Sequence, residues 1–233
     1  MTSTPRIYVD CLSAYNAGTP QGAWIDVTDL QSVQSDIHEL LKTCPDPNVI
    51  LRDAKCEICD SSYHLPVTSR LVDVSAGCPG TCITCNTEGG LTVKLDWDGD
   101  PYPSSTEWAV HDYEGFGGAH LGEHPNLDDI VRLAGLIRAH GPVAGDLYEQ
   151  LEEDIDLVER TYASGGYQGE YGSLAEYAKQ HLERSGFFTG LTRYQMAAVR
   201  QHFDFESFGQ GMLTDGDVIT VERDGKLHVF VKI

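Results

Sequence analysis

The sequence predicts an α+β fold, because its strand patterns and helix patterns occupy separate stretches of the chain. Short strand patterns open it at residues 7–9 and 24–27, joined by a loop rich in turn-forming residues. Helical spacing of apolar residues dominates the middle. Near the end, two alternating runs flank Asp224-Gly225, a dipeptide typical of a two-residue β-hairpin turn. We therefore expect a small sheet, a helical region and a closing hairpin.

The first helix is expected directly after the opening strands. Asp29 stands where a helix N-cap belongs, and apolar residues such as Val33 and Ile37 follow at helical spacing. A strand pattern returns at residues 108–113, after an interruption at about residues 44–95. The first sheet is therefore predicted to resume beyond an insertion.

The insertion holds two C-x-x-C knuckles separated by 22 residues, which are Cys56/Cys59 and Cys82/Cys85. Two such knuckles facing each other supply the four thiolates of a closed, tetrahedral structural zinc site. We expect a zinc-ribbon-like insertion with structural zinc, and Cys78 or His64 are alternative ligands. Free thiols and a redox pair are the other interpretations, and the second would need a thioredoxin-like βαβ setting that this stretch lacks.

Two amphipathic helices are predicted in the middle of the chain. Asn126 can cap the first, which ends at Gly141-Pro142. The second is expected as one continuous helix from about Gly145 to Tyr162. Its apolar residues form one stripe and its acids occupy the remaining surface. Those acids are Glu149, Glu152, Glu153, Asp156 and Glu159.

Two further helices are expected to begin with capping boxes at Ser173 and Thr192 and to run to about Arg184 and His202. The predicted domains follow from this order of elements. They are an N-terminal α+β domain (1–43 plus 96–116), the Cys-rich insertion (44–95), an acidic helical domain (117–165) and a C-terminal α+β domain (166–233).

The net charge of −20 comes from 36 acidic against 16 basic residues. Residues 96–160 alone hold 16 acids and three bases. Nucleic-acid binding needs a basic footprint on the protein, so this composition argues against it. No signal peptide or apolar run of membrane-spanning length is recognisable, and we expect a cytoplasmic protein without membrane partners.

Catalytic motifs are missing from the sequence: it has no phosphate-binding loop, nucleophile elbow, zinc-hydrolase helix or dinucleotide fingerprint. His120 and His124 have the spacing of helical metal ligands, but the surrounding glycines and Pro125 favour a loop. Cys11 lies in a strand pattern and is more simply a buried thiol than a nucleophile. No catalytic residue is proposed, and we expect a protein that is not an enzyme.

Four ordered segments carry a resemblance to the ArdA antirestriction proteins. The opening residues 7–9, 15–18 and 22–24 resemble the family's Y-V…Y-N-x-G…G-x-W pattern. Residues 107–116 resemble its central acidic strand and turn. Residues 167–178 are similar to its Y-x-G-x-Y-x-S-L-x-x-Y-A segment, and residues 202–206 to its late Y-[IF]-D-[YF]-E block. The resemblance covers about residues 6–43 and 106–233, and the Cys-rich stretch departs from it.

The resemblance implies an elongated homodimer of small domains that mimics duplex DNA and blocks type I restriction–modification enzymes. Surface carboxylates would take the place of phosphates. The residues expected to do so are Asp112, Glu114, Asp128, Asp129, Glu149, Glu152, Glu153, Asp156 and Glu159. Tyr162, Tyr167 and Tyr171 could serve either a dimer contact or packing within a domain.

Two other classes of function remain at this stage. A zinc-ribbon-containing acidic adaptor that binds another protein is the alternative. A zinc enzyme would call for three ligands and a carboxylate base rather than four knuckle thiolates. The restriction system, and whether modification is blocked as well as cleavage, do not follow from the sequence.

Overall fold

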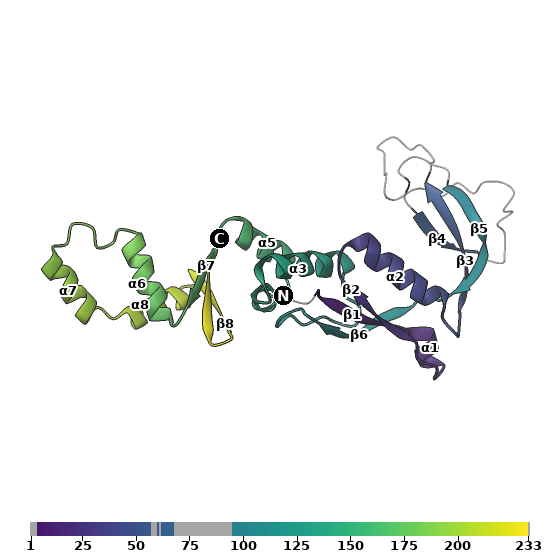
Figure 1. The fold of residues 1–233 in the computed structure, drawn as a ribbon, viewed down its shortest axis with the longest axis horizontal. Helices are drawn as coiled ribbons and strands as arrows, with labels where there is room; N and C mark the ends of the chain where they lie inside the picture. Colours follow the sequence, from purple (N-terminus) through teal and green to yellow (C-terminus); the bar gives the residue numbers. More distant parts are fainter. Residues whose placement is uncertain (1–3, 57–59, 61, 68–94, 233) are drawn as a thin grey trace. The chain divides into compact units, whose positions relative to one another are not determined.

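The computed structural model describes residues 4–56, 60, 62–67 and 95–232. The chain forms two compact units. The N-terminal unit comprises Arg6–Tyr113 and Leu121–Leu127, and the C-terminal unit comprises Met1–Pro5, Glu114–His120 and Asp128–Ile233. In the described part of the chain, helices are combined with three small three-stranded sheets, so the predicted α+β class is confirmed (Figure 1).

A three-stranded sheet begins the N-terminal unit, with strand order β2-β1-β6. Its strands are β1 (Arg6–Cys11), β2 (Gly22–Asp26) and β6 (Trp108–Glu114), and the short helix α1 (Leu12–Asn16) follows β1. β1 and β2 are antiparallel, with Tyr8 opposite Trp24. Because β6 lies beside β1, the prediction that the sheet resumes after the interruption is confirmed.

Helix α2 (Leu30–Lys42) packs against this sheet. The Asp29 carboxylate accepts a hydrogen bond from the backbone N–H of Ser32, so the predicted N-cap is confirmed. Val33 and Ile37 are buried on the helix face toward the core. Polar residues, His38 among them, occupy its other faces.

A second three-stranded antiparallel sheet, with order β4-β3-β5, lies in the same unit. It consists of β3 (Val49–Cys56), β4 (Ser62–Pro66) and β5 (Leu95–Ser104). The register places Asp53 on β3 directly opposite His64 on β4. Cys56 ends β3 beside Leu95 of β5, whereas β4 ends at Pro66 beside Leu51, so Pro66 and Leu95 lie at opposite ends of this sheet.

The C-terminal unit begins with three helices, α3 (Leu127–His140), α4 (Val143–Gln150) and α5 (Ile155–Ala163). The prediction of one continuous helix from Gly145 to Tyr162 is wrong, because residues 151–154 form a turn. Asp154 explains the break, since its carboxylate accepts a hydrogen bond from the Leu157 N–H and caps a new helix. The pattern of apolar residues did not reveal this break, because the two short helices bury their apolar residues in the same unit.

The rest of the unit combines three helices with a sheet of order β7-β9-β8. Its elements are β7 (Tyr167–Tyr171), α6 (Leu174–Arg184), α7 (Arg193–His202), α8 (Phe205–Thr214), β8 (Val218–Arg223) and β9 (Lys226–Val231). Both predicted caps are present, and Thr192 with Gln195 forms a complete capping box. Asp224 and Gly225 have φ of 51° and 73°, as a type I′ turn requires, so the hairpin is confirmed.

Strands β8 and β9 and helix α6 enclose the core of this part. Tyr171, Leu174, Tyr177, Val218 and Val229 form a buried cluster.

Among the described residues, no helix is long and apolar enough to cross a membrane.

Candidate partner-binding surface

The nine acids proposed as phosphate mimics are distributed over both units. Asp112 belongs to the N-terminal unit and the other eight to the C-terminal unit. Seven of the nine are exposed, whereas Asp129 and Glu159 are half-buried. Asp112 accepts a hydrogen bond from the backbone N–H of Tyr113. Glu149, at the end of α4, accepts one from the backbone N–H of His120, at 2.9 Å.

Four of the acids surround one guanidinium group, that of Arg132 on α3. Glu159 accepts two hydrogen bonds, from Nε at 3.0 Å and from Nη2 at 2.5 Å. Asp156 accepts another from Nη2 at 2.5 Å. Nη1 lies 3.9 Å from a carboxylate oxygen of Asp128 and 3.7 Å from one of Asp129. We call Asp156 and Glu159 the clamped pair, because Arg132 fixes their carboxylates against α3.

Arg132 also determines the charge of the clamped pair. Its hydrogen bonds hold the pKa of both the Asp156 and the Glu159 carboxyl below the ordinary values. In return, the hydrogen bonds that Arg132 donates to Glu159 and Asp156 raise the pKa of the guanidinium. Four acids against one base leave this cluster with a net charge of about −3 at neutral pH. It is therefore an acidic surface with an internal cation.

Glu152 and Glu153 lie in the turn between α4 and α5 and differ from the clamped pair in two respects. Their φ angles are 55° and 63°, in the left-handed region that favours glycine. Both side chains are exposed, and no described residue forms a hydrogen bond or ion pair with either carboxylate. We call them the open pair. The correction to the helix prediction thus moves these acids from a helical face to a strained, exposed turn.

The proposed zinc ligands lie largely beyond the described part of the chain. Cys59, Cys78, Cys82 and Cys85 all lie outside the described residues, and only the backbone of Cys56 is described. His64 is described, and it contacts Asp53 and His38 rather than any described cysteine.

The two cysteines outside the knuckles, Cys11 and Cys44, lie together in the N-terminal unit. Both are buried, and their Sγ atoms are 2.6 Å apart. Burial alone would raise the pKa of the Cys11 thiol, but hydrogen bonds from Cys44, Ser13 and other neighbours outweigh burial and lower it. The expectation of a buried thiol at Cys11 is confirmed.

The predicted loop at His120 and His124 is also confirmed, because neither residue lies in a helix or strand. His111, the other histidine near that pair in sequence, contacts Asp10. Its Nδ1 lies 3.1 Å from a carboxylate oxygen of Asp10 on β1.

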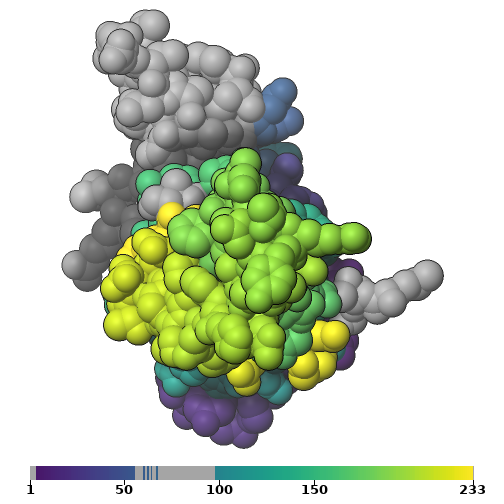
Figure 2. Space-filling model, turned by 90° about the vertical axis from the view of Figure 1, so that its left-hand side faces the viewer, coloured from purple at the N-terminus to yellow at the C-terminus, as the bar shows by residue number. Residues whose placement is uncertain are grey.

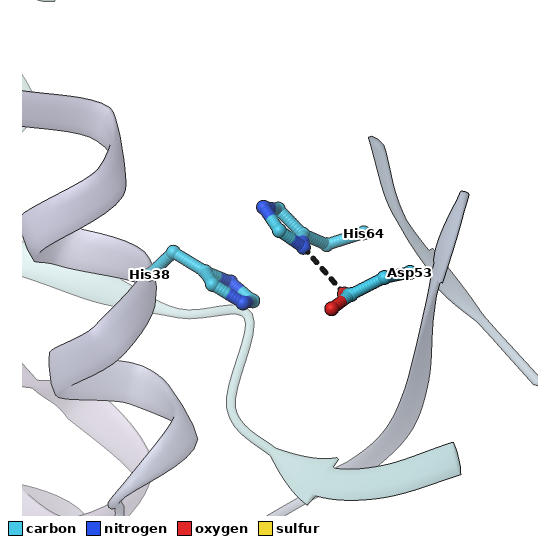
Figure 3. Close-up of side chains that lie close together, drawn as sticks. All are labelled: His38, Asp53 and His64. Carbon is cyan, nitrogen blue, oxygen red and sulfur yellow. Dashed lines mark hydrogen bonds and ion pairs between the residues drawn. The ribbon is translucent and has the colours of Figure 1, made fainter. Parts of the chain in front are cut away.

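A cluster that the sequence analysis missed joins α2 to the second sheet. His38, Asp53 and His64 bring one ligand atom each to within 4.8 Å of one another (Figure 3). The hydroxyl of Tyr102 lies at its centre, 2.5 Å from Asp53 Oδ1 and 3.0 Å from His38 Nε2. The pairing of β3 with β4 creates this cluster, and residue spacing alone gave no sign of that register.

Comparison with known proteins gives one match. The model of the family described as antirestriction protein (ArdA) matches residues 7–225, a range that includes the Cys-rich segment. No curated protein matches the chain. No solved structure matches it.

Proposed function

Since the chain belongs to the ArdA family of antirestriction proteins, we propose that it blocks type I restriction–modification enzymes as a mimic of duplex DNA. Its carboxylates would occupy the groove in which lysine and arginine side chains of the enzyme hold phosphates. Such a decoy needs charges at suitable positions and no reaction, so we propose that the protein is not an enzyme.

The open pair is the observation that carries this proposal. A glutamate in the left-handed region costs about 1–2 kcal/mol relative to an ordinary backbone, and glycine would avoid that cost. Two successive glutamates keep this conformation and expose carboxylates that bind nothing in the described chain. The backbone N–H groups of Glu152 and Glu153 donate to the carbonyls of Glu149 and Tyr148, so this turn ends α4. Glycine is the usual residue at such a helix end, so two exposed glutamates there point to a use for their charge.

The spacing of the acids supports the same proposal. Duplex DNA carries one phosphate charge per about 1.7 Å of its axis when both strands are counted, or about 3.4 Å per strand. Residues three or four apart on a helix are about 5–6 Å apart, and Asp156 and Glu159 on α5 have this spacing. With the open pair in the preceding turn, four carboxylates fall within eight residues of chain. Salt should weaken the complex, as it weakens phosphate contacts.

The test is competition between the protein and DNA for a purified type I restriction–modification enzyme. We expect Glu152→Gln with Glu153→Gln to weaken inhibition about tenfold, or ~1.4 kcal/mol. The matched control is Asp26→Asn with Asp36→Asn in the N-terminal unit. Both of these acids are exposed, and their exchange removes the same charge.

The control separates position from net charge. If both variants lose inhibition equally, the protein is only acidic and the mimicry proposal fails. If neither variant loses inhibition, the open pair is not part of the contact surface. Thermal unfolding of both variants must match that of the unchanged protein, so that a loss of inhibition reports on binding alone.

We also propose that the protein works as a homodimer. Apolar side chains of the C-terminal unit are available for a second copy, because α7 has no buried residue and Phe187 and Tyr194 are 65% and 86% exposed. In Figure 2 this helix faces the viewer. Tyr162 and Tyr167 instead pack on Phe230 within their own unit. Sedimentation as a monomer at micromolar concentration would contradict the dimer.

Structural zinc at Cys56, Cys59, Cys82 and Cys85 belongs to the proposal as well. Support comes from the sheet register, which brings the end of the Cys-rich segment at Leu95 beside Cys56. Two C-x-x-C knuckles are the ligand set of a zinc ribbon. Elemental analysis without any zinc would remove this part of the proposal.

A further inference from the structure

We propose that His38, Asp53 and His64 form a second metal site, which binds a transition-metal ion of the zinc class. Two imidazoles and one carboxylate are the ligands that zinc uses together with thiolates, whereas calcium and magnesium prefer oxygen alone. Three protein ligands leave one position of a tetrahedral ion for water or for the neighbouring Tyr102 hydroxyl. None of the four knuckle cysteines is a ligand of this proposed site.

The fold determines the positions of the three ligands. Asp53 and His64 are direct partners on β3 and β4, and their side chains meet at 2.7 Å between Oδ1 and Nδ1. His38 reaches them from α2, and its ring lies against that of His64, with centroids 3.4 Å apart and planes 12° from parallel (Figure 3). A metal lies in the plane of each imidazole that binds it, so one ring must turn for both to ligate the same ion.

The three donor groups suit a divalent transition metal. Imidazole nitrogen and carboxylate oxygen both bind zinc, and the single carboxylate of Asp53 supplies acidic oxygens beside the two rings.

Tyr102 provides the outer support that metal ligands usually have. Its hydroxyl contacts the carboxylate of Asp53, the Nε2 atom of His38 and, at 3.3 Å, the Nδ1 atom of His64. Partners of this kind orient the ligands and raise metal affinity. Because α2 also packs on the first sheet, an ion here would join the two sheets of the N-terminal unit through this helix.

The experiment uses the full chain without an affinity tag, stripped with chelator and reloaded with Zn²⁺. We expect His38→Gln with His64→Gln to hold one zinc fewer per chain than the unchanged protein. The matched control is His120→Gln with His124→Gln, which removes two loop histidines and should retain all the zinc. Equal zinc in the His38/His64 variant and the unchanged protein would overturn the site and leave a purely structural polar cluster.

Cobalt distinguishes this site from the knuckle cysteines. In a variant with Cys56, Cys59, Cys78, Cys82 and Cys85 all exchanged for serine, bound Co²⁺ should give visible bands without thiolate charge transfer, and adding His38→Gln and His64→Gln should abolish them. Asp53→Asn keeps the size of the side chain and is the second test if the histidine variant unfolds. We expect it to weaken cobalt binding at least tenfold, and unaltered affinity would contradict the proposal.

Discussion

The clamped pair and the open pair fall within eight residues of chain, yet a basic side chain binds the carboxylates of the clamped pair only. Asp156 and Glu159 share the guanidinium of Arg132, and their pKa values are lowered accordingly. Glu152 and Glu153 have no such partner and occupy strained backbone. The comparison teaches that an acidic surface can contain charges that hold the fold together and charges that are left for a partner. Counting the acidic residues in a sequence does not distinguish these two kinds of charge.

Removing the guanidinium of Arg132 is expected to have the largest effect on stability. Arg132→Gln deletes the bidentate bond to Glu159 and leaves four carboxylates crowded without a cation. We expect the free energy of unfolding to fall by about 1 kcal/mol, at the upper end for partly exposed pairs. The measurement is chemical denaturation of the C-terminal unit in the full chain.

Arg193→Gln is the matched control for that change. Arg193 is exposed on α7 in the same unit and forms no hydrogen bond or ion pair with the described residues. Its exchange alters the net charge equally and should leave stability within ~0.5 kcal/mol. If both variants lose the same stability, the general excess of acids matters and the clamp does not.

At low pH, the Arg132→Gln variant and the unchanged protein should become equally stable. Arg132 lowers the carboxyl pKa values of the clamped pair, so the stability it contributes is complete above their ordinary values of 3.8 and 4.5. That contribution is lost as pH falls through the lowered folded-state values. The two unfolding temperatures should therefore differ at pH 7 and converge below about pH 4. A constant difference down to pH 2 would show that packing of the arginine, not its charge, stabilises the unit.

The smallest expected effect has the opposite sign. Glu152→Gly with Glu153→Gly relieves two left-handed backbones, and the entropy of glycine in the unfolded chain offsets part of the gain. We expect the unit to become more stable by about 0.5 kcal/mol while inhibition of the restriction enzyme weakens. Higher stability with full inhibition would mean that the strain has no bearing on binding.

Local chemistry made part of this fold predictable. Asp29, Ser173 and Thr192 cap helices at the expected places, and Asp224-Gly225 forms the expected turn, because caps and tight turns depend on neighbouring residues alone. The break at residues 151–154 escaped prediction because two short helices and one long helix can bury the same apolar stripe. The Asp154 cap was the available signal.

Contacts between distant residues were the part of the site that sequence could not supply. Arg132 meets Glu159 across two helices, and His38 meets His64 only because β3 and β4 pair in a particular register. Neither pairing has a characteristic spacing. The acids were correctly expected to be largely exposed, but which of them are bound by a basic side chain depends on the position of Arg132 on α3 relative to α5.

Arg132 also affects how strongly added salt should weaken the binding of a partner to this surface. DNA releases condensed counterions when a protein binds it, and that release contributes much of the binding free energy. At the clamped pair the counterion is a covalent part of the chain, and it cannot diffuse away when a partner arrives. Carboxylates around Arg132 can therefore match the positions of phosphates without matching their entropy of ion release. In the proposed mimicry, the guanidinium would make this region a more rigid but thermodynamically weaker substitute for a nucleic-acid backbone than its acid count suggests.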